Sequence, residues 1–186
     1  MGKQAVTKLN IYNLLMKMIV LSITAAFGLS LSTRADEVKI SNVHLCCKGC
    51  VTSVEKAVGS VPGVTATADQ AAGTVTLTGA DSASLQKGAT ALLKAGYFGK
   101  SSDSNIKMEA KTGAKGVQTK SMHVEGVHLC CAKCVKAVDH AVKSVPGVKE
   151  QTATKGAESF EVTGDFNDQE VFNALQKEGL TGKVGK

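Results

Sequence analysis

The sequence predicts an α+β protein made of two tandem copies of a small unit with the element order βαββαβ. Three observations support this fold class: a long internal repeat, short stretches of alternating apolar residues, and two helical stretches in each repeat. An antiparallel four-stranded sheet with both helices on one face satisfies this order. We therefore expect two tandem ferredoxin-like sandwiches.

The internal repeat sets the domain organisation. The segment from Asn42 to Val64 reads NVHLCCKGCVTSVEKAVGSVPGV, and it aligns without a gap with GVHLCCAKCVKAVDHAVKSVPGV, from Gly126 to Val148. TVTLTG then matches SFEVTG, and ALLKAGYFGK matches ALQKEGLTGK, in the same order. These ordered matches predict two homologous domains, at residues 36–104 and 120–186. Residues 105–119, rich in Lys, Gly and Ala, are expected to be a flexible linker.

Each repeat is expected to contain four strands and two helices. The first helix of each follows its cysteines, presents Val at i, i+3, i+7 and i+10, and ends at a Val-Pro-Gly-Val turn. A phase change in the first apolar alternation of each repeat predicts a bulge or bend near Asn42 and Gly126. The other expected elements are strands Val38–Ser41, Val64–Ala68, Thr74–Thr78 and Phe98–Ser101 with helix Ser82–Lys94, and strands Met122–Glu125, Lys149–Thr154, Ser159–Thr163 and Gly182–Gly185 with helix Asp168–Lys177.

All six cysteines fall in two Cys-Cys-x-x-Cys motifs, and none lies elsewhere in the chain. A disulfide framework would scatter cysteines to join distant segments, so this clustering favours a metal site. Thiolates select Cu(I), Zn(II) and heavier soft ions over Mg²⁺ or Ca²⁺. A helix N-terminus also lowers the pKa of a thiol, because its N–H groups favour the anion. The alternative is an oxidised Cys47–Cys50 pair with no metal role.

These features resemble the heavy-metal-associated domain of copper chaperones and soft-metal P-type ATPases. The resemblance rests on the element order, the Cys-x-x-Cys where the first strand meets the first helix, and the Val-Pro-Gly-Val exit. It covers nearly the whole mature chain, twice. It implies one soft ion per domain, Cu(I) or Zn(II) above all.

The resemblance also assigns roles within the motifs. Leu45 and Leu129 stand where the family buries Met. The additional thiol at the start of each motif departs from the family pattern. It makes trigonal coordination feasible and leaves the identity of the metal open. The family's ligand pairs fall on Cys47 with Cys50 and on Cys131 with Cys134, and the extra, assisting thiols are Cys46 and Cys130.

Two further pairs of residues are candidates at the rim of each site. His44 and His128 occupy matching positions, either as exposed strand residues or as ligands, especially for Zn(II). Lys100 and Lys183 match the region where eukaryotic copper chaperones carry a Lys beside the metal, so they either offset thiolate charge or are ordinary solvated surface. Tyr97 or Phe98 of the first repeat is replaced by Leu180 or Thr181 in the second. Either the two sites differ in affinity or solvent exclusion, or these residues are simply part of the core.

The N-terminal segment has the composition of an export signal. Basic residues precede an uncharged apolar run from Met18 to Leu31, and the small residues Thr33 and Ala35 fit a signal peptidase site. Residues 1–35 are thus expected to be a signal peptide that directs the protein to the periplasm or outside the cell. An uncleaved anchor is the alternative, although the run is short for a membrane span. Translation from Met16 would give a more usual signal sequence.

The charge distribution argues against nucleic-acid binding. The chain has a net charge of +6, but four of its 22 basic residues and none of its 16 acidic residues lie in residues 1–35. Arg34 is the only Arg, the side chain that most often reads bases and phosphates. The sequence therefore predicts neither a nucleic-acid partner nor a stable membrane span after cleavage.

The function predicted from these features is binding and carrying of a soft metal outside the cytoplasm, as a chaperone, scavenger or buffer. Transfer would proceed by thiolate exchange with the Cys-x-x-Cys of another metal-transfer protein or a transporter. This function is not enzymatic. The alternatives are a thiol–disulfide oxidoreductase and an oxidatively cross-linked structural module using the same cysteines.

Overall fold

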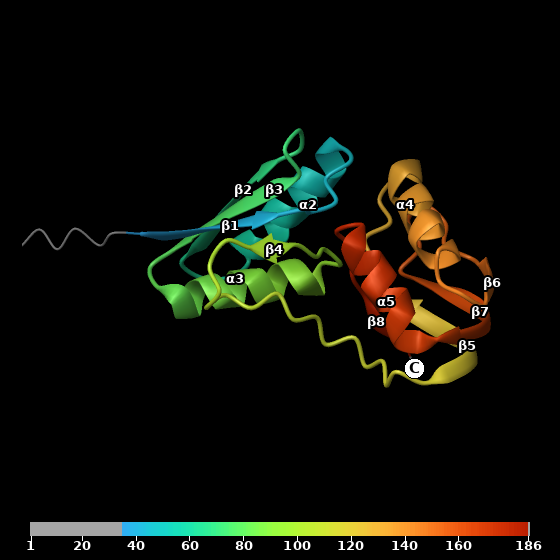
Figure 1. The fold of residues 1–186 in the computed structure, drawn as a ribbon. Helices are drawn as coiled ribbons and strands as arrows, with labels where there is room; N and C mark the ends of the chain where they lie inside the picture. Colours follow the sequence, from blue (N-terminus) through green and yellow to red (C-terminus); the bar gives the residue numbers. More distant parts are fainter. Residues whose placement is uncertain (1–34, 186) are drawn as a thin grey trace, which may run out of the picture. The chain divides into compact units, whose positions relative to one another are not determined.

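The computed structural model describes residues 35–185, and each repeat in this range forms an antiparallel four-stranded sheet with two helices (Figure 1). The predicted signal peptide lies outside the described residues, apart from Ala35. In the described part, no helix combines the length and apolar character needed to cross a membrane. The elements are β1 (Asp36–Ser41), α2 (Lys48–Gly59), β2 (Val64–Asp69), β3 (Thr74–Gly79), α3 (Ser82–Lys94) and β4 (Lys100–Ser101), then β5 (Gln118–Glu125), α4 (Ala132–Lys143), β6 (Val148–Gln151), β7 (Ser159–Asn167), α5 (Asp168–Lys177) and β8 (Lys183–Val184).

The two sheets have the same topology. The strand order is β2-β3-β1-β4 in the first and β6-β7-β5-β8 in the second, and all neighbouring strands are antiparallel. The first strand of each repeat is therefore central, and it runs directly into the cysteine motif. This arrangement confirms the predicted α+β class and the order βαββαβ.

Each sheet buries one face against its helices. Along β1, Val38 and Ile40 are buried while Lys39 between them is exposed. Facing them, α2 buries Cys50, Val54 and Val58. Val54 and Val58 belong to the stripe predicted from the Val spacing, whereas Val51 and Val61 of that stripe are only partly buried. The second cysteine of each Cys-x-x-Cys is thus part of a hydrophobic core, which fixes its position.

The chain leaves each first strand through a left-handed residue. Asn42 has φ of 60° and Gly126 has φ of 76°, at the positions where the sequence predicts a bulge or bend. Asn and Gly are the residues that adopt this conformation most readily. The turn changes the phase of the alternation, so that Val43 and Leu45 are buried as Val38 and Ile40 are.

The second sheet extends further than its sequence predicts. β5 begins at Gln118, inside the segment predicted as a linker, and β7 continues to Asn167 rather than ending at Thr163. The reason is that Thr119 pairs with Phe166, a fully buried residue, beyond a β-bulge. The start of the predicted linker also packs on the first domain, since Lys107 N–H donates to Gln86 Oε1 at 2.7 Å.

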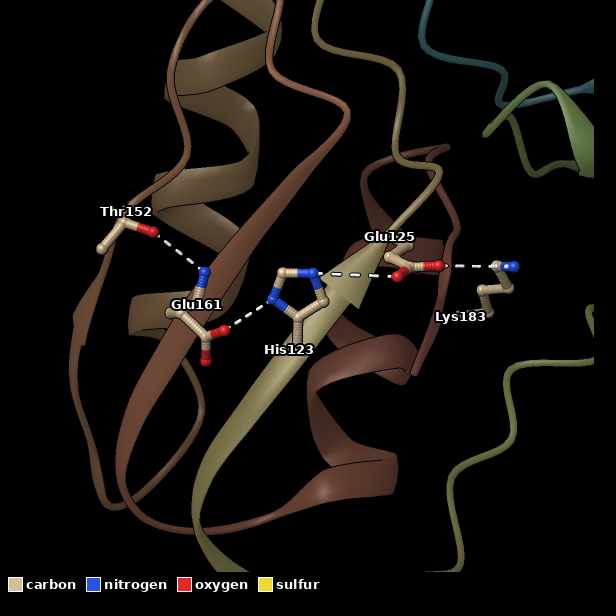
Figure 2. Close-up of polar contacts among 5 residues, drawn as sticks. All are labelled: His123, Glu125, Thr152, Glu161 and Lys183. Carbon is tan, nitrogen blue, oxygen red and sulfur yellow. Dashed lines mark hydrogen bonds and ion pairs between the residues drawn. The ribbon is translucent and has the colours of Figure 1, made fainter. Parts of the chain in front are cut away.

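The exposed face of the second sheet carries a polar row across three strands. His123 of β5 lies between two carboxylates, with Nδ1 2.5 Å from Glu161 and Nε2 3.8 Å from Glu125 (Figure 2). Lys183 of β8 extends the row, with Nζ 3.4 Å from Glu125 Oε2. The row is a cross-strand surface network, which stabilises pairing modestly.

One buried carboxylate joins the residues before β5 to the first turn of α5. Asp168 is 7% exposed, and its carboxylate accepts hydrogen bonds from the backbone N–H groups of Lys115 and Val117 at 2.8 and 2.9 Å. Burial alone would raise the pKa of this carboxyl, but the N–H donors outweigh it and the pKa lies below its usual value. The ionised form is therefore the one that holds the segment in place.

We predict that Asp168→Asn lowers the free energy of unfolding by about 1–3 kcal/mol, because one buried N–H group loses its acceptor. Urea unfolding measures this loss, and Asp165→Asn on the exposed surface is the matched control. Because the folded-state pKa is depressed, the contribution of Asp168 is present above the unfolded pKa of about 3.9 and is lost as the pH falls through the folded value. If the difference in the free energy of unfolding between the two variants stayed constant as the pH fell to the acid transition, the ionised Asp168 carboxylate would not be its source.

Candidate metal centre

Each cysteine motif sits where its helix begins. Cys47 is the N-cap of α2 and Cys131 the N-cap of α4, both with extended backbone and neither using its side chain to cap the helix. Their sulfurs are therefore free for other contacts. The last cysteine of each motif, Cys50 or Cys134, lies in the first turn with no exposed surface. The helix start thus presents one accessible and one buried thiol beside free N–H groups.

Two loops bring the motif of one repeat to that of the other. The described residues from Ala35 onward belong to one compact unit, so these are contacts within a single body. Tyr97 after α3 pairs as an isolated antiparallel bridge with Leu180 after α5. Phe98 N–H donates to Gly179 O at 3.0 Å, and Thr181 N–H donates to Gly96 O at 2.9 Å. The two repeats thus meet through matching segments.

Glycine is required at the centre of this contact. A Cβ on Gly179 would lie 2.6 Å from the backbone nitrogen of His44, and a Cβ on Gly96 would lie 2.6 Å from that of His128. Both glycines also have positive φ, 74° and 86°. They allow each loop to approach the backbone just before the cysteines of the other repeat, and His44 N–H donates to Gly179 O at 3.3 Å.

The sulfurs of all six cysteines consequently lie together. Cys46 Sγ is 3.4 Å from the sulfurs of both Cys131 and Cys134 in the other repeat. It is farther, 3.7 Å, from the sulfur of its own Cys50. The extra thiol of the first motif is therefore closer to Cys131 and Cys134 of the second motif than to Cys50 of its own.

The second motif repeats this arrangement. Cys130 Sγ is 3.5 Å from Cys47 Sγ and 3.6 Å from Cys50 Sγ. The two core cysteines meet at the middle of the cluster, with Cys50 and Cys134 sulfurs 3.9 Å apart. All six cysteines are free thiols in the structure. Their separations within the Cys-x-x-Cys pairs are 3.7 Å for Cys47 and Cys50, and 3.8 Å for Cys131 and Cys134.

The environments of these thiols move their pKa values in opposite directions. Backbone N–H groups of Cys134 and Lys133 at the start of α4 lower the pKa of Cys131 to about 6. Burial instead raises the pKa of Cys46 to about 12 and also raises that of Cys130. The predicted effect of the helix N-terminus thus appears at Cys131 but not at the extra thiols.

The two core cysteines behave as a coupled pair. The hydrogen bond between them lowers the pKa of Cys50 and raises that of Cys134. Such opposite shifts are expected when two close thiols share one proton. The metal-free cluster therefore holds a mixture of thiols and thiolates.

The paired histidines lie against the cluster. The Nε2 atoms of His44 and His128 are buried without a hydrogen-bond partner in the described residues. Burial lowers the pKa of His44, which keeps its imidazole neutral and able to bind a metal. A ligand atom of His128 lies within 4.8 Å of those of Cys50, Cys130 and Cys134, which gives a mixed sulfur and nitrogen donor set.

The predicted aromatic difference between the repeats is visible here. Tyr97 is fully buried, its hydroxyl donates to Cys50 O at 3.2 Å, and its ring lies 4.7 Å from that of His128. Leu180 occupies the matching position in the other repeat and offers no hydroxyl. Tyr97 therefore supports the first turn of α2 at Cys50, and the described residues show no equivalent contact at Cys134.

The two candidate lysines lie apart from these contacts. Lys183 Nζ contacts Glu125, and Lys100 is exposed on β4. No hydrogen bond joins either lysine to a sulfur within the part of the chain that the structure describes. Sequence reasoning did not select Gly96 and Gly179, although their matching positions in the repeat alignment were a signal.

The first repeat matches a family of known domains. Residues 37–98 match the sequence model of the Heavy-metal-associated domain. Similar solved structures include the N-terminal domain of PacS from Synechocystis PCC6803, with 22% identity over 37% of this chain and 100% of that chain and a TM-score of 0.34. They also include the N-terminal soluble domains of Bacillus subtilis CopA, with 18% identity over 82% and 95% and a TM-score of 0.30. A third is the water soluble region of the P-type ATPase CopA from Bacillus subtilis, with 20% identity over 81% and 91% and a TM-score of 0.26. A search of curated proteins found no match.

We predict that Cys131 is alkylated faster than Cys130 in the reduced, metal-free protein at pH 7, because the thiolate is the reactive form. Limited iodoacetamide labelling followed by peptide mass spectrometry measures both rates. The Cys131 rate should rise with pH through about 6 and level off above it. Equal rates for the two neighbours, or a Cys131 rate that rises only near the ordinary thiol pKa, would contradict the assigned environment.

Proposed function

We propose that this protein binds and carries soft metal ions outside the cytoplasm, as a chaperone, scavenger or buffer. The observation that carries this proposal is the convergence, at two helix N-termini, of six free thiols and two imidazoles whose Nε2 atoms are buried without a hydrogen-bond partner in the described residues. Thiolates and imidazoles together suit Cu(I), Zn(II) and Cd(II) rather than hard cations. Each Cys-Cys-x-x-Cys motif supplies ligands for at least one ion.

The second repeat is proposed as a second heavy-metal-associated domain. The family match covers residues 37–98 only, but the second repeat has the same cysteine motif and the same strand order. Its motif begins a helix in the same way as the first. These shared features support a duplicated metal-binding unit.

The proposed location is the periplasm or the cell exterior. The support is the composition of residues 1–35, with a basic start, an apolar run and small residues at a cleavage position. In such a compartment the protein would receive or deliver ions by stepwise exchange with the Cys-x-x-Cys of a transporter or another carrier. Accessible Cys47 and Cys131 are the sulfurs that begin the exchange.

The principal alternative function is thiol–disulfide exchange. The lowered pKa of Cys131, to about 6, is the observation that favours it. We place it second because the buried cysteines contact thiols of the other repeat, which a two-cysteine redox cycle does not require. Insulin reduction separates the two: catalytic turnover would support the oxidoreductase, and its absence together with metal uptake would support the carrier.

We predict that replacing Cys47, Cys50, Cys131 and Cys134 together by Ser abolishes uptake of Cu(I), Zn(II) and Cd(II), because hydroxyls are poor ligands for soft ions. The measurement is metal content after anaerobic loading and gel filtration. His140→Gln, which removes an exposed imidazole from the far end of α4, is the control and should bind as the unchanged protein does. Unchanged metal content in the four-serine variant would refute the proposed function.

A further inference from the structure

We propose that the six thiols form one shared, polynuclear Cu(I)–thiolate centre, rather than two separate sites with one ion each. This inference rests on the proposed function and specifies its metal, its nuclearity and the role of the extra cysteines. The ion here is cargo, and the chain's own residues determine how many ions it holds.

The spacing of the sulfurs fits three-coordinate ions. With a metal–sulfur bond of about 2.3 Å, the sulfurs of a trigonal site lie about 4.0 Å apart, whereas those of a linear site lie about 4.6 Å apart. The Cys-x-x-Cys pairs are separated by 3.7 and 3.8 Å, too close for a linear ion. Each pair also has a third sulfur from the other repeat at a similar distance. This sulfur is that of Cys130 for the first pair and that of Cys46 for the second.

The cluster contains four such triangles. Each has all three sides between 3.4 and 3.9 Å, and neighbouring triangles share a side. Ions in adjacent triangles would therefore be bridged by common sulfurs. The triangles are Cys47 with Cys50 and Cys130, Cys50 with Cys130 and Cys134, Cys46 with Cys50 and Cys134, and Cys46 with Cys131 and Cys134.

Tetrahedral all-sulfur coordination has no equivalent set. No four of the six sulfurs, all of which the structure describes, are all in mutual hydrogen-bonding contact. A tetrahedral Zn(II) site needs four sulfurs that are mutually about 3.8 Å apart. The arrangement therefore favours Cu(I), which accepts three thiolates, over Zn(II) bound by sulfur alone.

The extra cysteine of each motif is what makes the centre shared. Cys46 belongs to two of the triangles, and both include Cys134 of the other repeat. Cys130 likewise belongs to two triangles, and both include Cys50. Without these thiols, each repeat keeps its Cys-x-x-Cys pair and Cys50 still contacts Cys134, but none of the four triangles is complete.

Charge supports a polynuclear centre. Binding of about four Cu(I) ions to the six thiols releases up to six protons and leaves a net charge of about −2, with no change in oxidation state. Two Cu(I) ions would leave either buried thiols without metal or a larger excess of negative charge. Bridged ions therefore neutralise the buried sulfurs more completely.

The test is anaerobic titration of the reduced protein with a Cu(I) complex, read by native mass spectrometry and copper-edge X-ray absorption. We expect uptake of about four Cu(I) per chain, with a short Cu–Cu distance in the absorption spectrum. In the double variant Cys46→Ser with Cys130→Ser, the copper content should fall about two-fold, to one Cu(I) ion per remaining Cys-x-x-Cys pair. The short Cu–Cu distance should be absent from its absorption spectrum. This double variant keeps both family ligand pairs, so its metal binding does not vanish.

A second variant tests the approach of the repeats without removing any ligand. Gly179→Ala places a Cβ against the backbone of Asn42 and His44, whereas Gly63→Ala has the same φ of 74° and no atom within 4 Å of its Cβ. Both variants carry similar backbone strain, so only the first should lose the additional copper. Circular dichroism establishes that each variant is folded.

The outcomes separate this inference from the proposed function. One Cu(I) per motif without a Cu–Cu distance, equal copper content in the two alanine variants, or two Zn(II) ions with imidazole ligands would overturn the shared centre and leave metal carriage standing. Failure to bind Cu(I), Zn(II) or Cd(II) at all would overturn both.

Discussion

The contact on which the metal centre depends is the approach of two backbone loops that have no side chain at their closest point. Gly96 and Gly179 lie against the residues that precede the opposite cysteine motif, and a Cβ at either would collide with main-chain atoms. Because this approach is made by backbone rather than by side chains, the two motifs can lie next to each other. The sulfurs then converge as a consequence of how each helix begins, with its N-cap thiol and its first-turn thiol directed to the same side.

That convergence sets two effects against each other. Burial disfavours the anionic form of the thiols, which raises the pKa of Cys46 and Cys130. The N–H groups at the start of a helix favour it, which lowers the pKa of Cys131. Six thiolates in one pocket would repel one another strongly, so metal ions are the natural source of compensating charge. In the proposed function, the energetic cost of the metal-free cluster is therefore part of what makes soft cations bind.

Sequence reasoning succeeded where local signals decide the structure. The bounds of α3 and α5 agree with the prediction, since Asp81 and Asn167 cap these helices with their side chains and the apolar period is regular. The predicted end of β7 was wrong, because its pairing partner is distant in the sequence. β7 continues to Asn167 since it pairs with residues that were predicted to belong to the linker. The motifs themselves could be identified from Cys spacing. Their meeting could not, because it depends on Gly96 and Gly179, whose surroundings are set by the tertiary structure.

The near symmetry of the two repeats is broken in a way that bears on transfer. Tyr97 donates to Cys50 O and covers His128, whereas Leu180 provides only apolar surface at the matching position. The first turn of α2 is therefore held by a side-chain hydrogen bond that has no counterpart in α4 among the described residues, and both core sulfurs are fully buried. Exchange with a partner needs an accessible sulfur that is already ionised, and Cys131 combines partial exposure with a lowered pKa. In the proposed function, ions would enter and leave past the accessible Cys47 and Cys131, while Cys50 and Cys134 would be the last sulfurs to release them.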